Sequence, residues 1–388
     1  MTYFIGVDIA KYTHYACIID SDGVVHSEPF PFENDLEGFK VLLSHVSHFD
    51  KDELIFGMES TAHYSNNLSN FLLSNSYRVG IINPIQTHAL RKTRIRNAKN
   101  DKIDSMVICQ ALSLRLHTEV TLNDTLLELK DLCRAYQNIK TMRSRTKIQY
   151  ATYIDQTFPE LYKYFKKNLH LNTTYQLLKQ YPLPSKINKV RIDTLTKLLQ
   201  NASHGRYGKE KALELKELCL TTVGIQRDSL GFQIQQAIEQ IELYTKQLEE
   251  IKDAIKTIVL SLNSPIMTIP GMGVIQAAII LSSIKDITLF SSPSKVLAYA
   301  GLDPRVYQSG NFKATSTRMS KRGSGMLRWA LVYAAYNVSL NSEMFKKYYN
   351  LKVSQGKTHY SALGHVAHKL VRVIFKLLTT NSSFIEAA

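Results

Sequence analysis

A heptad repeat of apolar residues is the feature that most limits how this chain of 388 residues can fold. Apolar side chains recur every seven positions on one seam, and three positions later on a second seam: Ile234, Ala237, Ile241, Tyr244, Leu248, Ile251, Ile255, Ile258 and Leu262. Four such heptads predict a coiled coil or a long helical hairpin. Burial within the chain's own bundle and a dimer seam fit this pattern equally well. Either way, the segment separates two other parts of the chain.

The first third of the chain alternates short apolar runs with amphipathic segments. We expect strands over residues 3–9, 15–20, 24–30, 54–60 and 77–83, and helices over 35–47, 62–75 and 101–116. The order βββαβαβα is that of the RNase H-like (RuvC-like) nuclease fold, although several doubly wound folds share part of it. The sequence therefore predicts an α/β N-terminal domain.

The remainder of the chain reads as helical. One long helix or two are expected over residues 126–165, short helices over 166–228, and further helices at 325–340 and 359–379. At roughly 150 residues per domain, the length is sufficient for two or three parts. We expect a first domain over residues 1–155, a helical and coiled-coil linker region over 156–262, and a mainly α-helical C-terminal domain over 263–388.

The charge of the chain changes sign along its length. The net charge is +15, yet residues 1–77 carry 3 basic and 11 acidic side chains, whereas residues 78–150 carry 14 basic and 6 acidic ones. An excess of positive charge favours a polyanionic partner, and the acidic first segment points to carboxylates gathered for a cation. No apolar run reaches the roughly 18 residues of a spanning helix, and the four cysteines are dispersed. We expect a cytoplasmic protein.

Four carboxylates stand at positions suited to metal binding. Asp8 lies between Val7 and Ile9 in an apolar strand, where an unpaired charge is costly, and Glu59 repeats this situation at the end of another strand. Asp101 and Asp104 are three residues apart, so a helix places them on one face. Carboxylate oxygens are hard ligands that suit Mg²⁺ or Mn²⁺. Two such ions about 3.5–4 Å apart activate a nucleophile and stabilise a leaving oxygen in phosphoryl transfer.

Basic side chains and one glycine turn form the candidate nucleic-acid surface. The turn in IPGMG opens an apolar helix and resembles the hairpin of helix-hairpin-helix modules, whose amides face a phosphate. The basic candidates come from the run before Asp101, from the long helix after it, and from a loop near residue 310. The candidate nucleic-acid-binding residues are Arg91, Lys92, Arg94, Arg96, Lys99, Arg143, Arg145, Lys147, Gly271, Gly273, Arg305, Lys313, Arg318, Lys321 and Arg322.

Several motifs at both ends of the chain resemble one family. They are GVDIAK (6–11), MES (58–60), INP (82–84), AKNDKIDS (98–105), IPGMG (269–273), AYAGLDPRVYQSG (298–310) and SKRGSGMLRWAL (320–331). This set resembles the DEDD-type, Piv invertase-like transposases of the insertion-sequence 110 family, and it spans almost the whole chain. The resemblance implies a transposase or site-specific recombinase of an insertion sequence.

The resemblance also implies a two-part catalytic site. Asp8, Glu59, Asp101 and Asp104 would be the metal ligands of a RuvC-like domain, and a serine of the C-terminal domain would attack a DNA phosphate. It further implies element-end and target DNA, a structured guide RNA, and a homo-oligomer, dimer or tetramer, as partners. The setting would be the nucleoid of a bacterium or archaeon.

The serine nucleophile is expected at Ser309, which matches the family's Ser-Gly position after the GLDPR segment. Ser320 is the rival and Ser316 a weaker one, whereas Ser324 reads as a helix N-cap. No histidine lies nearby in the sequence, so a metal or the surrounding Arg and Lys side chains would have to activate the hydroxyl. Two alternatives remain: a RuvC-like junction resolvase or metal-dependent nuclease without a serine intermediate, and a non-catalytic nucleic-acid scaffold.

Overall fold

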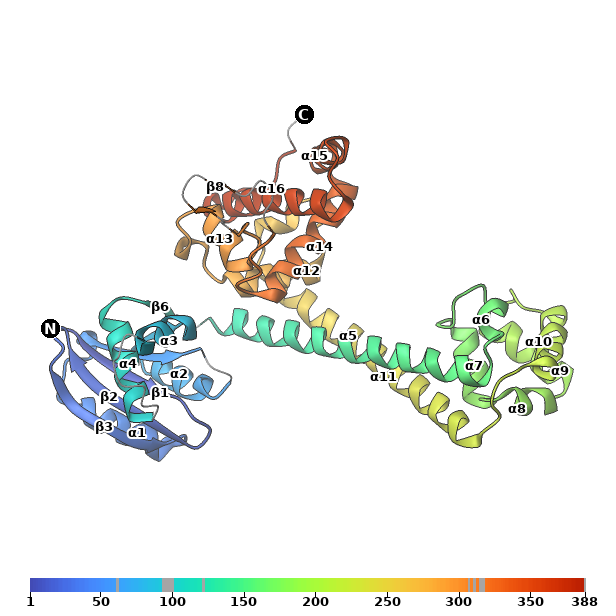
Figure 1. The fold of residues 1–388 in the computed structure, drawn as a ribbon, viewed down its shortest axis with the longest axis horizontal. Coiled ribbons are helices and arrows are strands. Elements are labelled where there is room, and N and C mark those ends of the chain that lie inside the picture. The colour runs from blue at the N-terminus through green and yellow to red at the C-terminus, as the bar shows by residue number, and fades with distance from the viewer. Residues whose placement is uncertain are drawn as a thin grey trace. The chain divides into compact units, whose positions relative to one another are not determined.

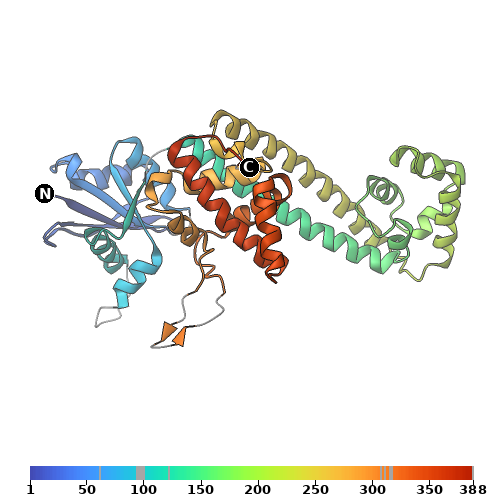
Figure 2. The same ribbon diagram turned by 90° about the horizontal axis from the view of Figure 1, so that it is seen from above.

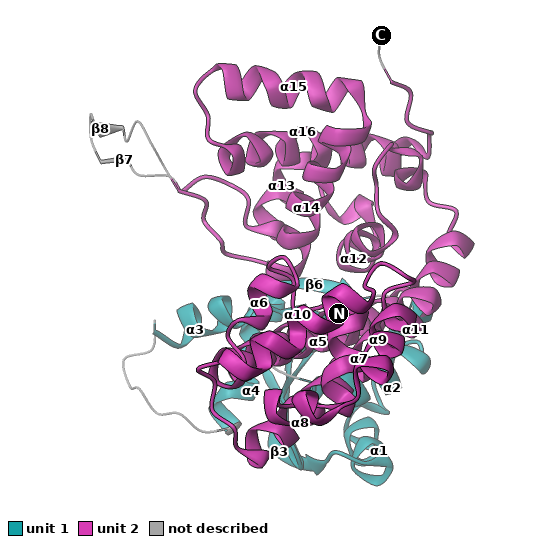
Figure 3. Cartoon of the chain, turned by 90° about the vertical axis from the view of Figure 1, so that its right-hand side faces the viewer, with its two compact units in different colours: residues 1–124 teal, residues 125–388 magenta. Residues whose placement is uncertain are grey.

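The computed structural model describes residues 1–60, 63–92, 101–120, 123–305, 308–309, 312–313 and 318–386 (Figure 1). The chain divides into two compact units, Met1–Asp124 and Thr125–Ala388 (Figure 3). Each unit has hydrophobic clusters of its own. The first is α/β and the second is mainly helical.

A mixed sheet of six strands forms the centre of the first unit. The strands are β1 (Tyr3–Asp8), β2 (Thr13–Asp20), β3 (Val25–Glu33), β4 (Leu54–Glu59), β5 (Arg78–Ile82) and β6 (His117–Val120). They lie in the order β3-β2-β1-β4-β5-β6. Strands β1, β4 and β5 are parallel, and β2, β3 and β6 pair antiparallel with their neighbours. The five strands expected from the sequence are therefore confirmed.

Helices cover both faces of this sheet because alternate residues of its central strands point to opposite sides. Ile5 and Val7 of β1 join a cluster with α1 (Leu36–Val46) and α2 (Ser65–Ser74). Phe4 joins another cluster with α4 (Asp101–Ser113). A β-carbon at Gly6 would lie 2.3 Å from the Ser105 carbonyl oxygen, so the glycine allows α4 to approach β1 closely.

Two elements of the first unit are not apparent from the sequence pattern. Helix α3 (Pro84–Lys92) begins directly after the strand expected over residues 77–83, and Thr87 is its one buried residue. Such a helix has little apolar periodicity to reveal it. Strand β6 is a four-residue edge strand with the sequence HTEV and no buried residue. A short 3-10 helix, η1 (Lys51–Glu53), precedes β4.

Two helices of 34 residues each, α5 (Asp124–Thr157) and α11 (Asp228–Ser261), organise the second unit. Both contribute to two separate hydrophobic clusters. The start of α5 and the end of α11 share one cluster, and the end of α5 and the start of α11 share the other. The helices therefore run in opposite directions between the two clusters (Figure 2). Ile234, Ile241, Leu248 and Ile255 of the heptad seam are buried within the chain.

Short helices lie between α5 and α11 in the sequence, and they form much of the cluster at the end of α5 and the start of α11. They are α6 (Leu161–Tyr164), α7 (Asn172–Gln180), α8 (Pro184–Lys189), α9 (Ile192–Ala202) and α10 (Lys209–Thr221). The expectation of short helices over residues 166–228 is thus confirmed.

The C-terminal cluster adds helices after α11. These are η2 (Pro265–Thr268), α12 (Val274–Ile284), η3 (Ile287–Leu289), α13 (Pro293–Ala300), α14 (Gly325–Asn341), α15 (Glu343–Ser354) and α16 (His359–Thr380), with the short strands β7 (Gln308–Ser309) and β8 (Phe312–Lys313). Helix α14 packs against α12, α15 and α16. Among the helices in the described part of the chain, none is long and apolar enough to cross a membrane.

Candidate active site

The ends of two parallel strands bring the first carboxylates together. Asp8 is the last residue of β1 and Glu59 the last of β4. These strands pair in parallel, with Val7 opposite Met58, so the two acidic residues follow at the same edge of the sheet. Glu59 is 8% exposed. A strand order in which β1 and β4 are neighbours therefore creates this acidic edge.

The third carboxylate comes from α4. Asp104 is 5% exposed and precedes Ser105, whose carbonyl oxygen lies against Gly6 of β1. The close approach that Gly6 allows therefore also holds the first turn of α4 beside the sheet. Helix α4 begins at Asp101, one turn before Asp104. The side chain of Asp101 lies outside the described residues.

One arginine joins two of these carboxylates. Arg91 is in the last turn of α3, and its Nη2 lies 2.8 Å from Glu59 Oε1 while its Nε lies 2.8 Å from Asp104 Oδ1. A single cationic side chain thus neutralises two carboxylates that have little contact with water. Buried charges require such a partner of opposite charge. From the sequence, Arg91 is expected among the nucleic-acid-binding residues. Its contact with the carboxylates depends on α3, a helix that the apolar pattern does not predict.

The same geometry tests whether these residues fit a divalent cation. Glu59 and Asp104 each have an oxygen 2.8 Å from one guanidinium group, so both reach a common positive charge. Their donor atoms are carboxylate oxygens, the ligands that Mg²⁺ and Mn²⁺ prefer. Within the described side chains, no group of three His, Cys, Asp or Glu residues is arranged to hold a metal. Asp101 is not among those side chains.

The segment with the expected serine nucleophile is a pair of short strands. Ser309 of β7 pairs with Phe312 of β8, although the side chains of Ser309 and Lys313 lie outside the described residues. The two ends of this segment lie side by side. The Arg318 carbonyl accepts a hydrogen bond from the Arg305 amide at 2.9 Å, and Pro304 forms a bridge with Met319. The two sides of the loop are therefore joined at its base.

The rival serine, Ser320, is part of that base. Its Oγ donates to Asp303 Oδ1 at 2.5 Å, and its amide donates to the Asp303 carbonyl at 2.8 Å. The same Oγ accepts from the Arg322 amide at 3.3 Å, and the residue is 9% exposed. These contacts give Ser320 a role in closing the loop.

The other two serines considered are Ser324 and Ser316. Ser324 accepts a hydrogen bond from the Leu327 amide and caps α14, which confirms its expected role. Ser316 lies outside the described residues.

The basic candidates fall into three groups. Arg305, Arg318, Lys321 and Arg322 are exposed around the loop base. On α5, Arg145 is exposed, Lys147 is half-buried, and Arg143 donates to Thr245 Oγ1 at 3.3 Å. Lys92 is exposed at the end of α3, whereas Arg94, Arg96 and Lys99 lie outside the described residues. The structure thus collects four of the candidates beside the segment that carries Ser309.

The glycine turn before α12 has a packing role. Gly271 has a φ of +87°, a left-handed conformation that favours glycine. A β-carbon there would lie 2.7 Å from the Asn337 carbonyl oxygen of α14. Gly273 occupies the N-cap position of α12. The contact with α14 explains why Gly271 must be glycine, and phosphate binding by the turn stays a prediction.

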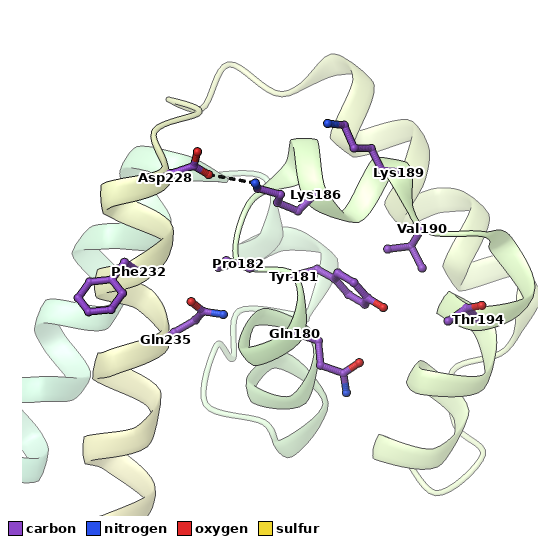
Figure 4. A pocket seen from close by; sticks show the side chains of 10 residues that line it. All are labelled: Gln180, Tyr181, Pro182, Lys186, Lys189, Val190, Thr194, Asp228, Phe232 and Gln235. Atoms are coloured by element: carbon purple, nitrogen blue, oxygen red, sulfur yellow. Dashed lines mark ion pairs between the residues drawn. The ribbon is translucent and has the colours of Figure 1, made fainter.

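An open pocket of about 670 Å³ lies among the short helices of the second unit (Figure 4). Its lining includes Tyr181, Lys189 and Phe232, and Lys186 pairs with Asp228 at 3.2 Å. The one carboxylate on its described wall is therefore already neutralised by a neighbour. No pair of groups suited to acid-base or metal chemistry is found among the described residues of this lining, and the carboxylates at the sheet edge remain the stronger candidate.

Comparison with known proteins finds two family models that match the chain. A transposase model of the DEDD type matches residues 5–159, and a model described as "Transposase IS116/IS110/IS902 family" matches residues 263–350. The first match contains Asp8, Glu59, Asp101 and Asp104, and the second contains Ser309 and Ser320.

Similar proteins include a gene-inverting protein, an insertion-element protein and a transposase. The pilin gene-inverting protein of Moraxella bovis is 24% identical over 98% of this chain and 97% of its own length. An insertion element IS110 protein of Streptomyces coelicolor is 25% identical over 72% of this chain and 71% of that protein. The transposase for IS1111A of Coxiella burnetii is 31% identical, over 31% of this chain and 33% of that protein.

Proposed function

The chain belongs to the IS110 family of transposases and is a DNA-modifying enzyme, and from that premise we propose that it cleaves and rejoins insertion-sequence DNA with metal-bound carboxylates and a serine nucleophile. The observation that carries the proposal is the arrangement at the sheet edge. Two nearly buried carboxylates, Glu59 and Asp104, meet around one positive charge at the strand end next to Asp8. Burying acidic groups in this way is costly unless a cation compensates them.

We propose that the first unit is a RuvC-like domain. Its first five strands lie in the order β3-β2-β1-β4-β5, with β1, β2 and β3 antiparallel and β4 and β5 parallel to β1. This arrangement supports an RNase H-like topology, in which acidic residues gather at the end of the first strand. The proposed domain boundaries remain residues 1–155, which comprise the first unit and most of α5, 156–262 and 263–388.

In this proposal Asp8, Glu59, Asp101 and Asp104 hold Mg²⁺ or Mn²⁺. The bound ions would polarise the scissile phosphate and stabilise the leaving oxygen. Arg91 keeps Glu59 and Asp104 in place in the absence of metal, since its guanidinium contacts both. With a metal at the carboxylates, the side chain of Arg91 would be free to contact a DNA phosphate, which is the role expected for it from the sequence.

The proposed nucleophile is Ser309. Its Oγ attacks a DNA phosphorus, forming a phosphoserine ester while the phosphorus–deoxyribose oxygen bond breaks and that oxygen takes up a proton. Arg305, Arg318, Lys321 and Arg322 lie around the base of the same loop and would bind the phosphate and stabilise its developing charge. The contacts of Ser320 with Asp303 support Ser309 over Ser320.

The proposed partners are element-end DNA, target DNA and an element-encoded guide RNA. A net charge of +15 supports polyanionic partners, and residues 304–385 contain 13 basic side chains and one acidic side chain. A homo-oligomer in which one subunit's carboxylates meet another subunit's serine completes the proposal. We place the protein at the nucleoid, in the cytoplasm.

A denaturing-gel assay tests the proposal. Purified protein with its co-purifying RNA would be incubated with labelled element-end DNA and Mg²⁺. We expect a protease-sensitive, covalently shifted band that is absent in Ser309→Ala, in Asp104→Asn and after chelation, and present in Ser324→Ala, which removes only a helix cap. Cleaved DNA without an adduct, unchanged in Ser309→Ala, would instead establish the alternative function, a RuvC-like junction resolvase or nuclease.

A further inference from the structure

The solvent-facing side of α14 is aromatic. Leu327, Ala330, Leu331, Ala334 and Val338 bury one side of this helix in the C-terminal cluster. The other side carries Trp329, Tyr333, Tyr336 and Leu340, whose spacing of four, three and four residues places them on one face. We call these four residues the α14 row.

The α14 row is well exposed along most of its length. Tyr333, Tyr336 and Leu340 are 48%, 41% and 61% exposed, whereas Trp329 is half-buried against the cluster. The aromatic surface extends to α16, where the His359 ring meets Tyr336 edge-on at 6.2 Å and Tyr360 is 80% exposed. A helix in a globular protein usually presents polar residues to water, so this exposed face of aromatic and apolar side chains points to a binding partner.

A lysine from another helix connects the α14 row to a basic surface. Lys140 of α5 places its Nζ 4.7 Å from the centre of the Trp329 ring and 5.7 Å from that of Tyr333. Arg143 and Lys147 follow Lys140 on the same face of α5, three and seven residues later. Burial and then the charge of Arg143 lower the pKa of both Lys140 and Lys147, so Arg143 repels each of the two lysines.

The sequence supplies no acidic residue that could neutralise this surface from its own elements. Helix α5 has no acidic residue between Asp131 and Asp155, and α14 has none at all. On α11, which Arg143 contacts through Thr245, Glu242 already pairs with Lys179. A negatively charged partner that also offers flat apolar faces to the rings therefore suits this surface. A second copy of the chain is disfavoured, because a two-fold contact through this face would bring two sets of these cations into one interface.

We propose that the α14 row, with Lys140 and Arg143, binds an unpaired DNA strand by stacking its bases on Tyr333 and Tyr336 and pairing its phosphates with the two cations. Single-stranded nucleic acid combines these two features, and proteins bind it through aromatic platforms in basic grooves. The inference rests on the proposed function, since strand cleavage and exchange leave stretches of DNA unpaired. The site is separate from the carboxylates and from Ser309, so binding requires neither metal nor cleavage.

Trp329 is the single tryptophan of the chain, and its fluorescence therefore reports on this surface alone. An oligothymidylate of about 16 nucleotides, the upper end of single-strand site sizes, would be titrated into the full chain with chelator present. Duplex DNA and oligouridylate of the same length form the other arms. We expect oligothymidylate to quench the Trp329 emission at lower concentrations than the other two.

Tyr333→Leu removes a ring while keeping an apolar side chain, so it leaves the fold intact. Loss of one stacked base should weaken oligothymidylate binding by roughly tenfold. Tyr333→Phe should bind like the wild type. Tyr162→Leu is the matched control, because Tyr162 is 43% exposed on α6, in the other hydrophobic region of the second unit.

Three results would overturn the proposal. One is unchanged affinity in Tyr333→Leu, measured both by Trp329 emission and by the anisotropy of a labelled strand. Another is quenching of Trp329 by duplex DNA or by oligouridylate at lower concentrations than by oligothymidylate, which would assign the surface to a different nucleic acid. The third is a change in emission that depends on protein concentration without DNA, which would assign it to a second copy of the chain. All three are independent of cleavage, so failure of the proposed catalysis leaves this test intact.

Discussion

Arg91 is the residue on which the carboxylate site depends in the metal-free protein. It is a cationic partner of Glu59 and of Asp104, at 2.8 Å from each, and both carboxylates are almost buried. An arginine suits this position because its planar guanidinium presents several donors at once. The sequence revealed the carboxylates through their apolar neighbours, whereas the arginine looked like one of several basic residues in a run.

We predict that Arg91→Met destabilises the protein by roughly 2–4 kcal/mol in the absence of divalent metal, since it leaves two buried carboxylates without this partner. Mg²⁺ should restore more stability to the variant than it adds to the wild type, because metal then takes over the compensation. Thermal unfolding with and without Mg²⁺ measures both effects. Arg78→Met is the control, because the pair of Arg78 with Glu119 is about half exposed and should contribute less than about 1 kcal/mol. Equal destabilisation in the two variants would contradict this role for Arg91.

At the scale of elements, the sequence predicted those whose apolar pattern is strong. Strands β1 and β4 are near-continuous apolar runs because they are buried on both faces. Helix α3 was not predicted because it buries only one residue. Strand β6 was not predicted because its four residues lie at the edge of the sheet. Element order brought Asp8 and Glu59 together, but the contact of Arg91 depends on the unpredicted α3. That contact could be found only in three dimensions.

The carboxylate of Asp20 holds the turn between β2 and β3, and its contribution to stability can be tested. Asp20 accepts from the amides of Asp22 and Val24, both at 2.9 Å, and pairs with His26 at 2.8 Å. The hydrogen bond with His26, followed by the two amides, lowers the pKa of Asp20. A lowered carboxyl pKa stabilises the fold above the ordinary value near 3.9, and this contribution disappears as the pH falls through the folded-state value.

We therefore predict that Asp20→Asn lowers the melting temperature at neutral pH and that the difference from the wild type shrinks as the pH falls below about 4. Melting curves of both proteins between neutral and acidic pH measure it. Asp50→Asn is the control, since Asp50 accepts from one amide in the exposed turn before β4. A difference for Asp20→Asn that is constant across this pH range would show that its charge does not stabilise the turn.

At the scale of the whole molecule, the uneven distribution of charge along the chain is the property most readily read from the sequence. The acidic first segment contains the strand-end carboxylates, and four of the basic C-terminal residues lie at the base of the loop that carries Ser309. The α14 row could not be predicted in the same way, because Trp329 and its neighbours resemble core residues in a helix whose apolar residues are not confined to one face. Whether these side chains are buried or exposed decides their role, and this depends on how the helices pack.

Four exposed cations at the loop base should contribute to DNA binding through counterion release. We predict that the double variant Lys321→Gln, Arg322→Gln weakens duplex binding and flattens the slope of log affinity against log salt by about 0.9 for each phosphate that is no longer neutralised. Binding isotherms at several salt concentrations give the slope. Lys197→Gln, at an exposed position on α9, should leave it unchanged. A slope that stays at the wild-type value in the double variant would show that the loop base does not bind the DNA backbone.

The most direct test of the central claim is to identify the residue that becomes attached to DNA. Covalent complexes formed with element-end DNA would be digested with protease and nuclease, and the modified peptide sequenced by mass spectrometry. We predict a nucleotide on Ser309, in the wild type and in Ser320→Ala alike. A nucleotide on Ser320, Ser316 or any other residue, or DNA that is cleaved and rejoined without any modified peptide, would contradict the proposed serine nucleophile.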